Sequence, residues 1–182
     1  MEKIPYLKDL GITAVELMPV TEFDEVMMSS SGNGFHDVKP EPTGYINYWG
    51  YGPSYLYAVK SAYASHGEMS AESEFKTLVK ELHRAGIECI PELYFTGKEL
   101  PGEIVSVLRY WVEEYHVDGF HLLGFPNLLL AAEDPFLKRT KLFAENWNEV
   151  MDRRPKKGYI TPGDGPVSVA EKNLAEYNMQ FM

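Results

Sequence analysis

Residues 7–20 read LKDLGITAVELMPV, and residues 82–95 read LHRAGIECIPELYF. Each stretch contains the end of a helix, a glycine suited to the left-handed position that stops a helix, and a β-rich apolar run. Each run ends near a proline and an acidic residue. Two further segments have the same apolar character, EEYHVDGFHLLGF at 113–125 and TKLFAENW at 140–147. Apolar runs of this length are typical of parallel strands that are buried on both faces.

Amphipathic helices are predicted between these strands. Apolar residues recur at helical spacing over residues 73–85 and again over 103–115. The alternation of strand and helix predicts parallel βαβ units with right-handed crossovers. An open doubly wound sheet and a barrel both satisfy this pattern. No glycine-rich phosphate fingerprint follows any strand, which disfavours the nucleotide-binding version.

The remaining segments look irregular. Residues 21–54 are rich in Ser, Gly, Pro and aromatic residues and are predicted to form a long connection, a type of segment that is often functional. Residues 152–182 are predicted to form an irregular tail with a short helix near 168–178 and no further strand. The length of 182 residues suits one domain, so residues 1–182 are assigned to a single unit.

Composition excludes several classes of function. The formal net charge of −10 argues against a nucleic-acid or anionic-membrane partner. The N-terminus has no apolar signal core and no run reaches transmembrane length, so a cytoplasmic location is expected. The single cysteine, Cys89, lies in an apolar run and is expected to be a buried, reduced thiol.

Several segments together resemble the α-amylase family of glycoside hydrolases, and its glycogen-debranching, isoamylase- and pullulanase-like branch in particular. They are IPYLKDLGITAVELMPV, NYWGYGPSYLYAVKSAYAS, EFKTLVKELHRAGIECIPEL, LRYWVEEYHVDGF and TKLFAENW. The resemblance implies an α/β fold, a partial (β/α)₈ barrel that corresponds to barrel strands two to five. Such barrels take about 250 residues, so this chain is short of a full one. No cofactor is expected.

The resemblance also assigns roles at the strand ends. The family's third strand ends in a pattern like DVVYNH, and the aligned residues here place Glu92 at the Asp, Thr96 at the Asn and Gly97 at the His. The fourth strand ends in a pattern like GFRFD, and here His121 replaces the Arg and Leu123 replaces the Asp nucleophile. Leucine cannot attack a sugar, so the covalent route is predicted to be lost.

The general acid of the family has a counterpart, because Glu145 in AENW stands where the family has its catalytic Glu. Retaining glycosidases need a second carboxyl group beside this acid. Glu145 alone would lack the group that stabilises the transition state. The resemblance therefore predicts the family's fold with an impaired active site.

Aromatic residues carry the remaining functional signal. The segment from Tyr48 to Tyr57 is dense in rings, and sugars stack on aromatic faces. In the family the Tyr of WGY, here Tyr51, packs against the sugar at the cleavage point. The predicted substrate-binding residues are Tyr51, Trp49, His121, Glu92 and Trp147. No metal site is predicted, since the acidic residues and histidines of the long connection lack the spacing of a calcium loop or a zinc site.

Three functions remain open from the sequence. The first is an α-glucan- or maltooligosaccharide-binding or regulatory protein that has lost hydrolysis. The second is an active debranching or amylolytic hydrolase that is completed by residues outside this chain. The third is a structural half-barrel that pairs with itself or with a partner, because half a barrel leaves strand edges unpaired.

Overall fold

The computed structural model describes residues 2–28, 42–65, 70–124, 129–144 and 174–176. Its centre is a five-stranded sheet in the order β1-β6-β7-β8-β9, and every pairing in it is parallel. Parallel neighbours joined by helices are the pattern predicted from the repeated strand segments. The strands are β1 (Ala14–Leu17), β6 (Glu88–Phe95), β7 (Gly119–Gly124), β8 (Lys141–Ala144) and β9 (Leu174–Glu176).

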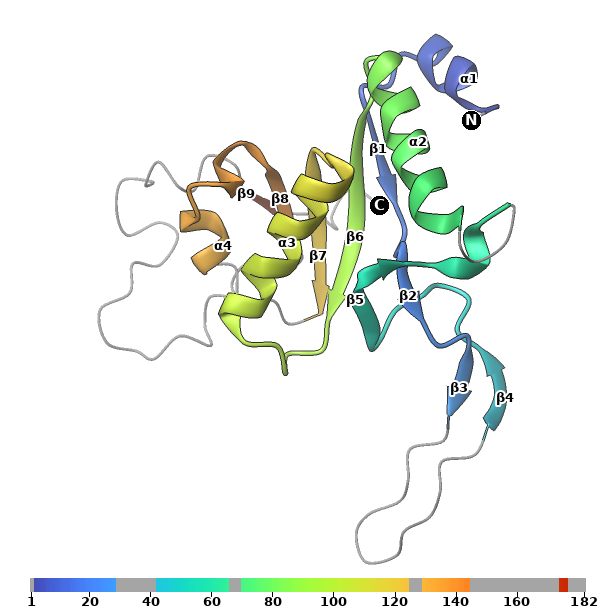
Figure 1. The fold of residues 1–182 in the computed structure, drawn as a ribbon, viewed down its shortest axis with the longest axis vertical. Helices are drawn as coiled ribbons and strands as arrows, with labels where there is room; N and C mark the ends of the chain where they lie inside the picture. Colours follow the sequence, from blue (N-terminus) through green and yellow to red (C-terminus); the bar gives the residue numbers. More distant parts are fainter. Residues whose placement is uncertain (1, 29–41, 66–69, 125–128, 145–173, 177–182) are drawn as a thin grey trace, which may run out of the picture.

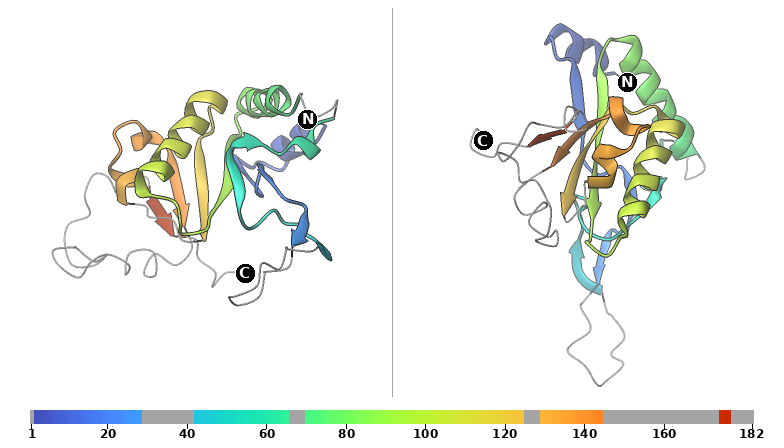
Figure 2. Two further views of the ribbon diagram at one scale, coloured as in Figure 1. Left: turned by 60° about the horizontal axis from the view of Figure 1, so that its bottom comes forward. Right: turned by 90° about the vertical axis from the view of Figure 1, so that its left-hand side faces the viewer.

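Two long helices cover one face of this sheet. They are α2 (Ala71–Arg84) and α3 (Pro101–Tyr115), which match the two helical patterns of the sequence within a few residues. Figure 2 shows both helices on the same side of the strands. The shorter helices are α1 (Ile4–Asp9) and α4 (Leu129–Glu133), with 3₁₀ turns at Ser61–Tyr63 and Leu137–Arg139. In the described part of the chain, no helix is long and apolar enough to cross a membrane.

The main hydrophobic core lies between the sheet and these helices. Trp111 and Tyr115 of α3 pack on each other and on Phe75 of α2, with ring centroids 4.7 to 5.6 Å apart. The Trp111 indole also donates a hydrogen bond to the Leu56 carbonyl at 2.7 Å. The strands contribute alternate apolar residues to the same core, including Cys89, Leu93, Phe120, Leu122 and Leu142.

Helix ends follow the sequence pattern. Gly11 and Gly86 both have a φ of +78°, which confirms the predicted left-handed stops before β1 and β6. His116 ends α3 in the same left-handed region, with a φ of 56°, although it is not a glycine. Asp118 then leads directly into β7, which begins at Gly119 without the turn that the Asp-Gly pair predicted. A side chain at Gly119 would place its Cβ 2.6 Å from the Lys141 carbonyl, so the close approach of β8 requires glycine there.

The long connection predicted at residues 21–54 contains three short strands that the sequence pattern did not indicate. They are β2 (Thr21–Phe23), β3 (Val26–Met28) and β4 (Pro42–Ile46). β2 pairs antiparallel with β5 (Ser54–Val59), and β3 pairs antiparallel with β4. Strands this short carry too few residues for an alternating pattern, so their pairing comes from tertiary contacts.

A buried lysine fastens β2 to the end of β5. The Lys60 ammonium lies 2.7 Å from a Glu22 carboxylate oxygen and 3.2 Å from one of Glu25. Burial lowers the pKa of Lys60, but the hydrogen bonds and charges of Glu22 and Glu25 outweigh it and raise the pKa above its ordinary value. The ammonium therefore stays charged, and it holds the start of the long connection against the sheet.

The prediction for the tail was wrong where the structure describes it. Leu174–Glu176 form β9, which pairs parallel with β8, where the sequence indicated a short helix and no further strand. Hydrogen bonding to the edge of β8 decides the conformation of this segment, and local propensity does not reveal such a partner. The rest of the predicted tail lies outside the described residues.

Candidate functional site

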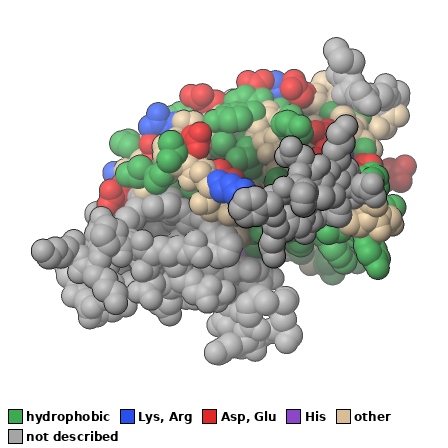
Figure 3. Space-filling model, turned by 90° about the horizontal axis from the view of Figure 1, so that it is seen from below, with side chains coloured by type: hydrophobic (Ala, Val, Ile, Leu, Met, Phe, Trp, Pro, Cys, Tyr) green, Lys and Arg blue, Asp and Glu red, His purple; other side chains and the backbone are tan. Residues whose placement is uncertain are grey.

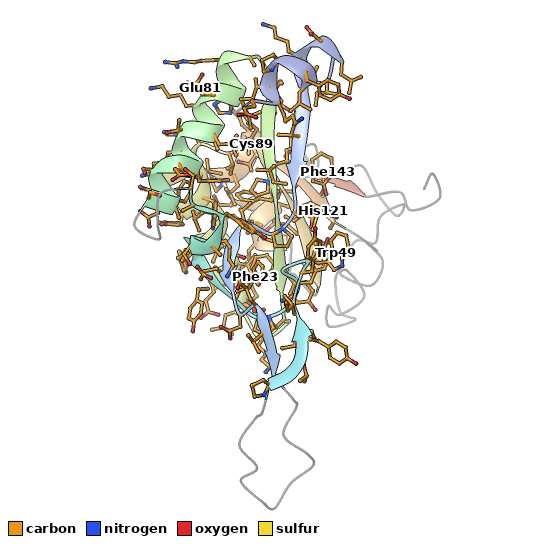
Figure 4. The ribbon with its side chains drawn as sticks, turned by 90° about the vertical axis from the view of Figure 1, so that its right-hand side faces the viewer. Phe23, Trp49, Glu81, Cys89, His121 and Phe143 are labelled. Atoms are coloured by element: carbon orange, nitrogen blue, oxygen red, sulfur yellow. The ribbon has the colours of Figure 1, made fainter. Side chains whose placement is uncertain are left out.

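The two faces of the sheet differ in chemistry. On the helix side, Leu93 and Leu122 belong to the hydrophobic core. The alternate residues on the other face include Glu92 and His121, which are register partners on β6 and β7. Figure 4 shows His121 and Phe143 on the side of the sheet away from α2, and Trp49 lies toward the same side. The polar candidate residues therefore share one face, near the carboxyl ends of the parallel strands.

Three strands bring Glu16, Glu92 and His121 together. His121 Nδ1 lies 2.5 Å from Glu16 Oε1, and Glu16 comes from β1. One ligand atom of each of the three side chains lies within 4.8 Å of the others. The set is called the Glu16–Glu92–His121 cluster below. Glu92 and His121 are 8% and 3% exposed, so most of the cluster is buried, while the Glu16 side chain is 39% exposed.

The cluster concentrates negative charge in a buried place. Burial raises the pKa of Glu92, and the neighbouring Glu16 carboxylate raises it further by its hydrogen bond and its charge. A hydrogen bond from the Tyr51 hydroxyl to Glu92 Oε2, at 2.9 Å, and the charge of His121 act in the opposite direction. The net shift is upward, so Glu92 holds its proton to a higher pH than an exposed glutamate does.

One exposed aromatic ring, that of Tyr51, contacts this cluster, and further exposed rings lie on the same segment of the chain. Tyr51 is 42% exposed, and its ring centroid lies 6.4 Å from that of Tyr94 on β6. Trp49 is 56% exposed and meets Tyr48 edge to face, with the centroids 5.1 Å apart. Tyr57, in contrast, packs on Tyr110 of α3. The ring-rich segment of the sequence is thus divided between the site and the helix side.

The segment that carries Trp49 and Tyr51 is held by specific bonds. The Asn47 side chain accepts a hydrogen bond from the Gly50 amide at 3.0 Å and donates one to the Tyr51 carbonyl at 3.1 Å. Gly50 has a φ of +77°, and a Cβ there would lie 2.7 Å from the Phe23 ring. The turn therefore requires glycine and presents the rings from a fixed backbone.

A cavity of about 1030 Å³ adjoins the ring-rich segment. Tyr48 and Trp49 contribute to its wall together with Phe23 and Tyr63, and Lys60 and Glu74 supply charged groups. Seen from below, where the strands end, the described surface mixes hydrophobic side chains with acidic ones (Figure 3). An apolar hollow edged by polar groups is the usual setting of a small-molecule site.

Comparison with known proteins gives the family. No family model matches the chain. The chain is 32% identical over 216 residues to isoamylase 3 of Oryza sativa subsp. japonica, an alignment that covers 81% of the chain and 26% of that protein. It is 30% identical over 205 residues to the glycogen operon protein GlgX homolog of Haemophilus influenzae, covering 80% of the chain and 29% of that protein. A glycogen debranching enzyme of Enterobacter sp. matches at 30% identity, with 80% and 29% covered. The chain belongs to the glycogen-debranching branch of the α-amylase family.

Solved structures agree on the fold. The pullulanase SAP of Group B Streptococcus superposes with a TM-score of 0.66 at 18% identity, over 96% of this chain and 28% of that one. The same pullulanase in complex with maltotetraose superposes with a TM-score of 0.61 at 20% identity, over 90% of this chain and 26% of that one. The sheet is therefore part of an α-amylase-family (β/α)₈ barrel, as predicted. The chain spans less than a third of each of these relatives.

Leu123 is the residue that the sequence resemblance assigned to the family's nucleophile position. Leu123 is buried, lies outside the helix-side core, and is the register partner of Tyr94. It therefore lies on the same face as His121, as the alternation along β7 predicts. The segment that the resemblance aligned with the end of the family's third strand continues past Phe95, where β6 ends. Thr96 and Gly97 form a turn in which the Glu99 carboxylate accepts hydrogen bonds from both.

The predicted site residues are thus brought together in part. Tyr51, Glu92 and His121 meet at one place, and Trp49 lies on the same segment as Tyr51. Glu145 and Trp147 lie outside the described residues, just after β8. Glu16 was missed by the sequence reasoning. The available signal was a single carboxylate inside the apolar run AVELMPV, in a stretch that repeats the layout of the one around Glu92.

Proposed function

We propose that this chain binds α-glucan through Tyr51 and Trp49 and does not hydrolyse it by the retaining route of its family. The proposal rests on the buried side chain of Leu123, which the sequence resemblance assigns to the nucleophile position, together with the exposed rings of Tyr51 and Trp49. A site of this kind keeps surface for sugar rings but lacks the group that attacks them.

Binding is supported by the rings and by the relatives. Tyr51 and Trp49 are exposed on a turn that is held by Asn47 and Gly50, so little entropy would be lost when a sugar stacks on them. A structural neighbour was solved with maltotetraose bound, and the sequence relatives are named as isoamylase and glycogen-debranching proteins. A linear α-glucan or a maltooligosaccharide is therefore the ligand class we infer.

Loss of hydrolysis is supported by the chemistry of the remaining groups. Retaining glycosidases use two carboxyl groups about 5–5.5 Å apart, one of which must be ionised to attack. Among the described carboxyl groups, Glu92 is the candidate to replace the nucleophile. It belongs to the neighbouring strand, however, and its pKa is raised by burial and by Glu16. His121, which the resemblance assigns to the position of the family's Arg, is hydrogen-bonded to Glu16. Neither residue replaces the missing nucleophile.

Native gel electrophoresis with and without amylopectin tests the binding half of the proposal. Amylopectin should retard the chain, and Tyr51→Ala or Trp49→Ala should weaken the affinity about tenfold each, since one ring contact is worth on the order of 1.4 kcal/mol. Tyr6→Ala is the matched control, because Tyr6 is an exposed tyrosine on α1, at the other end of β1. A folded chain that amylopectin does not retard contradicts binding.

Reducing-sugar release from amylopectin tests the other half. The wild-type chain and Glu145→Gln should both release no more sugar than buffer does. Release by the wild-type chain that disappears in Glu145→Gln would show that a general acid still works in this site, and would overturn the proposed loss of hydrolysis.

A further inference from the structure

The Glu16–Glu92–His121 cluster offers the donor atoms of a metal site. Its three side chains come from β1, β6 and β7, so three different strands converge on one point of the sheet. They offer one imidazole nitrogen and two carboxylate groups. We propose that this cluster binds a divalent transition-metal cation, with Zn²⁺ as the reference ion.

The spacing of the donors suits such an ion. Zinc binds nitrogen and carboxylate oxygen at about 2.0–2.2 Å, which places tetrahedral ligands about 3.3 Å apart. The ligand atoms of the cluster lie within 4.8 Å of one another, and His121 Nδ1 and Glu16 Oε1 are 2.5 Å apart. A cation that replaces the proton between this last pair would move the two atoms apart by about 1 Å. Glu16 can make this adjustment, because its side chain is 39% exposed.

The chemistry of the donors selects the class of ion. A neutral imidazole with carboxylates is a common set for Zn²⁺, Mn²⁺ and Fe²⁺. Ca²⁺ and Mg²⁺ take oxygen ligands and would leave the imidazole unused. Two carboxylates in a mostly buried place also carry charge that a dication would compensate. The donor set therefore favours a transition metal over an alkaline-earth ion.

Surrounding groups support the site from outside. The Tyr51 hydroxyl donates to Glu92 Oε2 at 2.9 Å, which fixes the carboxylate and leaves its other oxygen for the ion. An ion can reach His121 and Glu92 from solvent past the Glu16 side chain, because that side chain is partly exposed. The cation would be held on the face of the sheet opposite α2 and α3, with open coordination positions for water.

The chain contains a natural comparison for this cluster. His83 Nε2, in the last turn of α2, lies 2.8 Å from Asp118 Oδ2, just before β7 begins. This pair has the same two donor types but no third ligand in the described part of the chain. It should bind Zn²⁺ far more weakly, since two side chains cannot enclose a tetrahedral ion.

Titration calorimetry with ZnCl₂ on the chelator-treated chain, without glucan, tests the proposal independently of the proposed function. The wild-type chain should bind one Zn²⁺ at this site. His121→Ala and Glu16→Gln should each weaken that binding at least about tenfold, as loss of a ligand does. His83→Ala should bind as the wild-type chain does. Glu16→Gln keeps the shape of an exposed side chain, so it reports on the site even if His121→Ala fails to fold.

Two results would overturn the inference. One is Zn²⁺ affinity that is unchanged in a folded Glu16→Gln variant, or reduced equally in His83→Ala. The other is displacement of bound Zn²⁺ by Mg²⁺ at an equal concentration of the two ions. That result would mean that the imidazole is not a ligand.

Discussion

The two faces of the sheet contrast sharply. The helix side is a continuous apolar core in which Trp111, Tyr115 and Phe75 stack and β6 and β7 present leucines and phenylalanines. The other face presents Glu16, Glu92, His121 and Leu123, of which three are polar and two carry negative charge when ionised. Both faces are built by the same strands, residue by alternate residue.

The difference between the two faces shows that the residues that stabilise the fold and the residues that line the site lie on opposite sides of the sheet. Core packing constrains volume and polarity on the helix side, because a cavity or a buried polar group there costs several kcal/mol. The other face is not covered by α2 and α3, so polar and apolar residues such as His121 and Leu123 alternate along it while the strands still pair in register. The pairing of the strands therefore does not depend on which residues line the site.

The largest expected effect is on the helix side. Trp111→Ala should lower the free energy of unfolding by about 3–5 kcal/mol, because it opens a cavity and removes the hydrogen bond to Leu56. Leu123→Ala, on the other face and outside the main core, should cost about 2 kcal/mol, at the low end for a buried leucine. Urea denaturation of both variants gives the comparison. Equal losses would mean that the two faces contribute alike to stability.

An intermediate effect is expected from pH. A carboxyl group whose pKa is raised in the folded chain stabilises it most below its ordinary pKa, and that contribution falls as pH rises through the raised value. Glu92 is such a group, so its contribution to the free energy of unfolding should fall as pH rises, and Glu92→Gln should remove that fall. Glu22, Glu99 and Asp134, whose pKa values are lowered, contribute in the opposite direction in the wild-type chain and the variant alike. The measurement is the urea midpoint at a series of pH values.

A matched variant separates this effect from loss of charge alone. Glu133→Gln removes one carboxylate at the exposed end of α4 and should leave the wild-type pH dependence in place. If the stability curves of Glu92→Gln and Glu133→Gln against pH are the same, the raised pKa of Glu92 does not contribute to the pH dependence of stability.

The smallest expected effect comes from a single hydroxyl. Tyr51→Phe removes the hydrogen bond to Glu92 and should cost about 1 kcal/mol or less, since the tyrosine is partly exposed. The pKa of Glu92 should rise, because that bond lowers it. NMR titration of the Glu92 carboxyl measures the shift. Retardation by amylopectin should persist, since the ring remains, and its loss would assign glucan binding to the hydroxyl instead.

Local patterns were sufficient for much of the fold. The repeat around 7–20 and 82–95 predicted β1 and β6 with their glycine stops, and the helical spacing predicted α2 and α3. Cys89 is buried as predicted, and burial raises the pKa of its thiol to about 12. The short strands of the long connection and β9 escaped prediction, because each depends on a partner strand rather than on its own sequence.

The candidate site was also predicted only in part, because its contacts depend on residues far apart in the sequence. The strand alternation placed His121 and Leu123 on one face, and the resemblance aligned Glu92 with a family position. Tyr51 was chosen from its ring alone, yet the structure adds its hydrogen bond to Glu92. No local pattern could join Tyr51 to a residue of β6, since that contact spans 41 positions.

The sequence by itself determined the strands β1, β6, β7 and β8, the helices α2 and α3 with their apolar faces, and the absence of a carboxylate at position 123, because period and residue type are local properties. Only the tertiary structure decided which polar groups meet. Glu16 and His121 are 105 positions apart and touch because parallel strands β1, β6 and β7 lie side by side with their carboxyl ends at one edge. The charge that gathers there, with its raised glutamate pKa and its three converging donors, is a property of that pairing and of no segment alone.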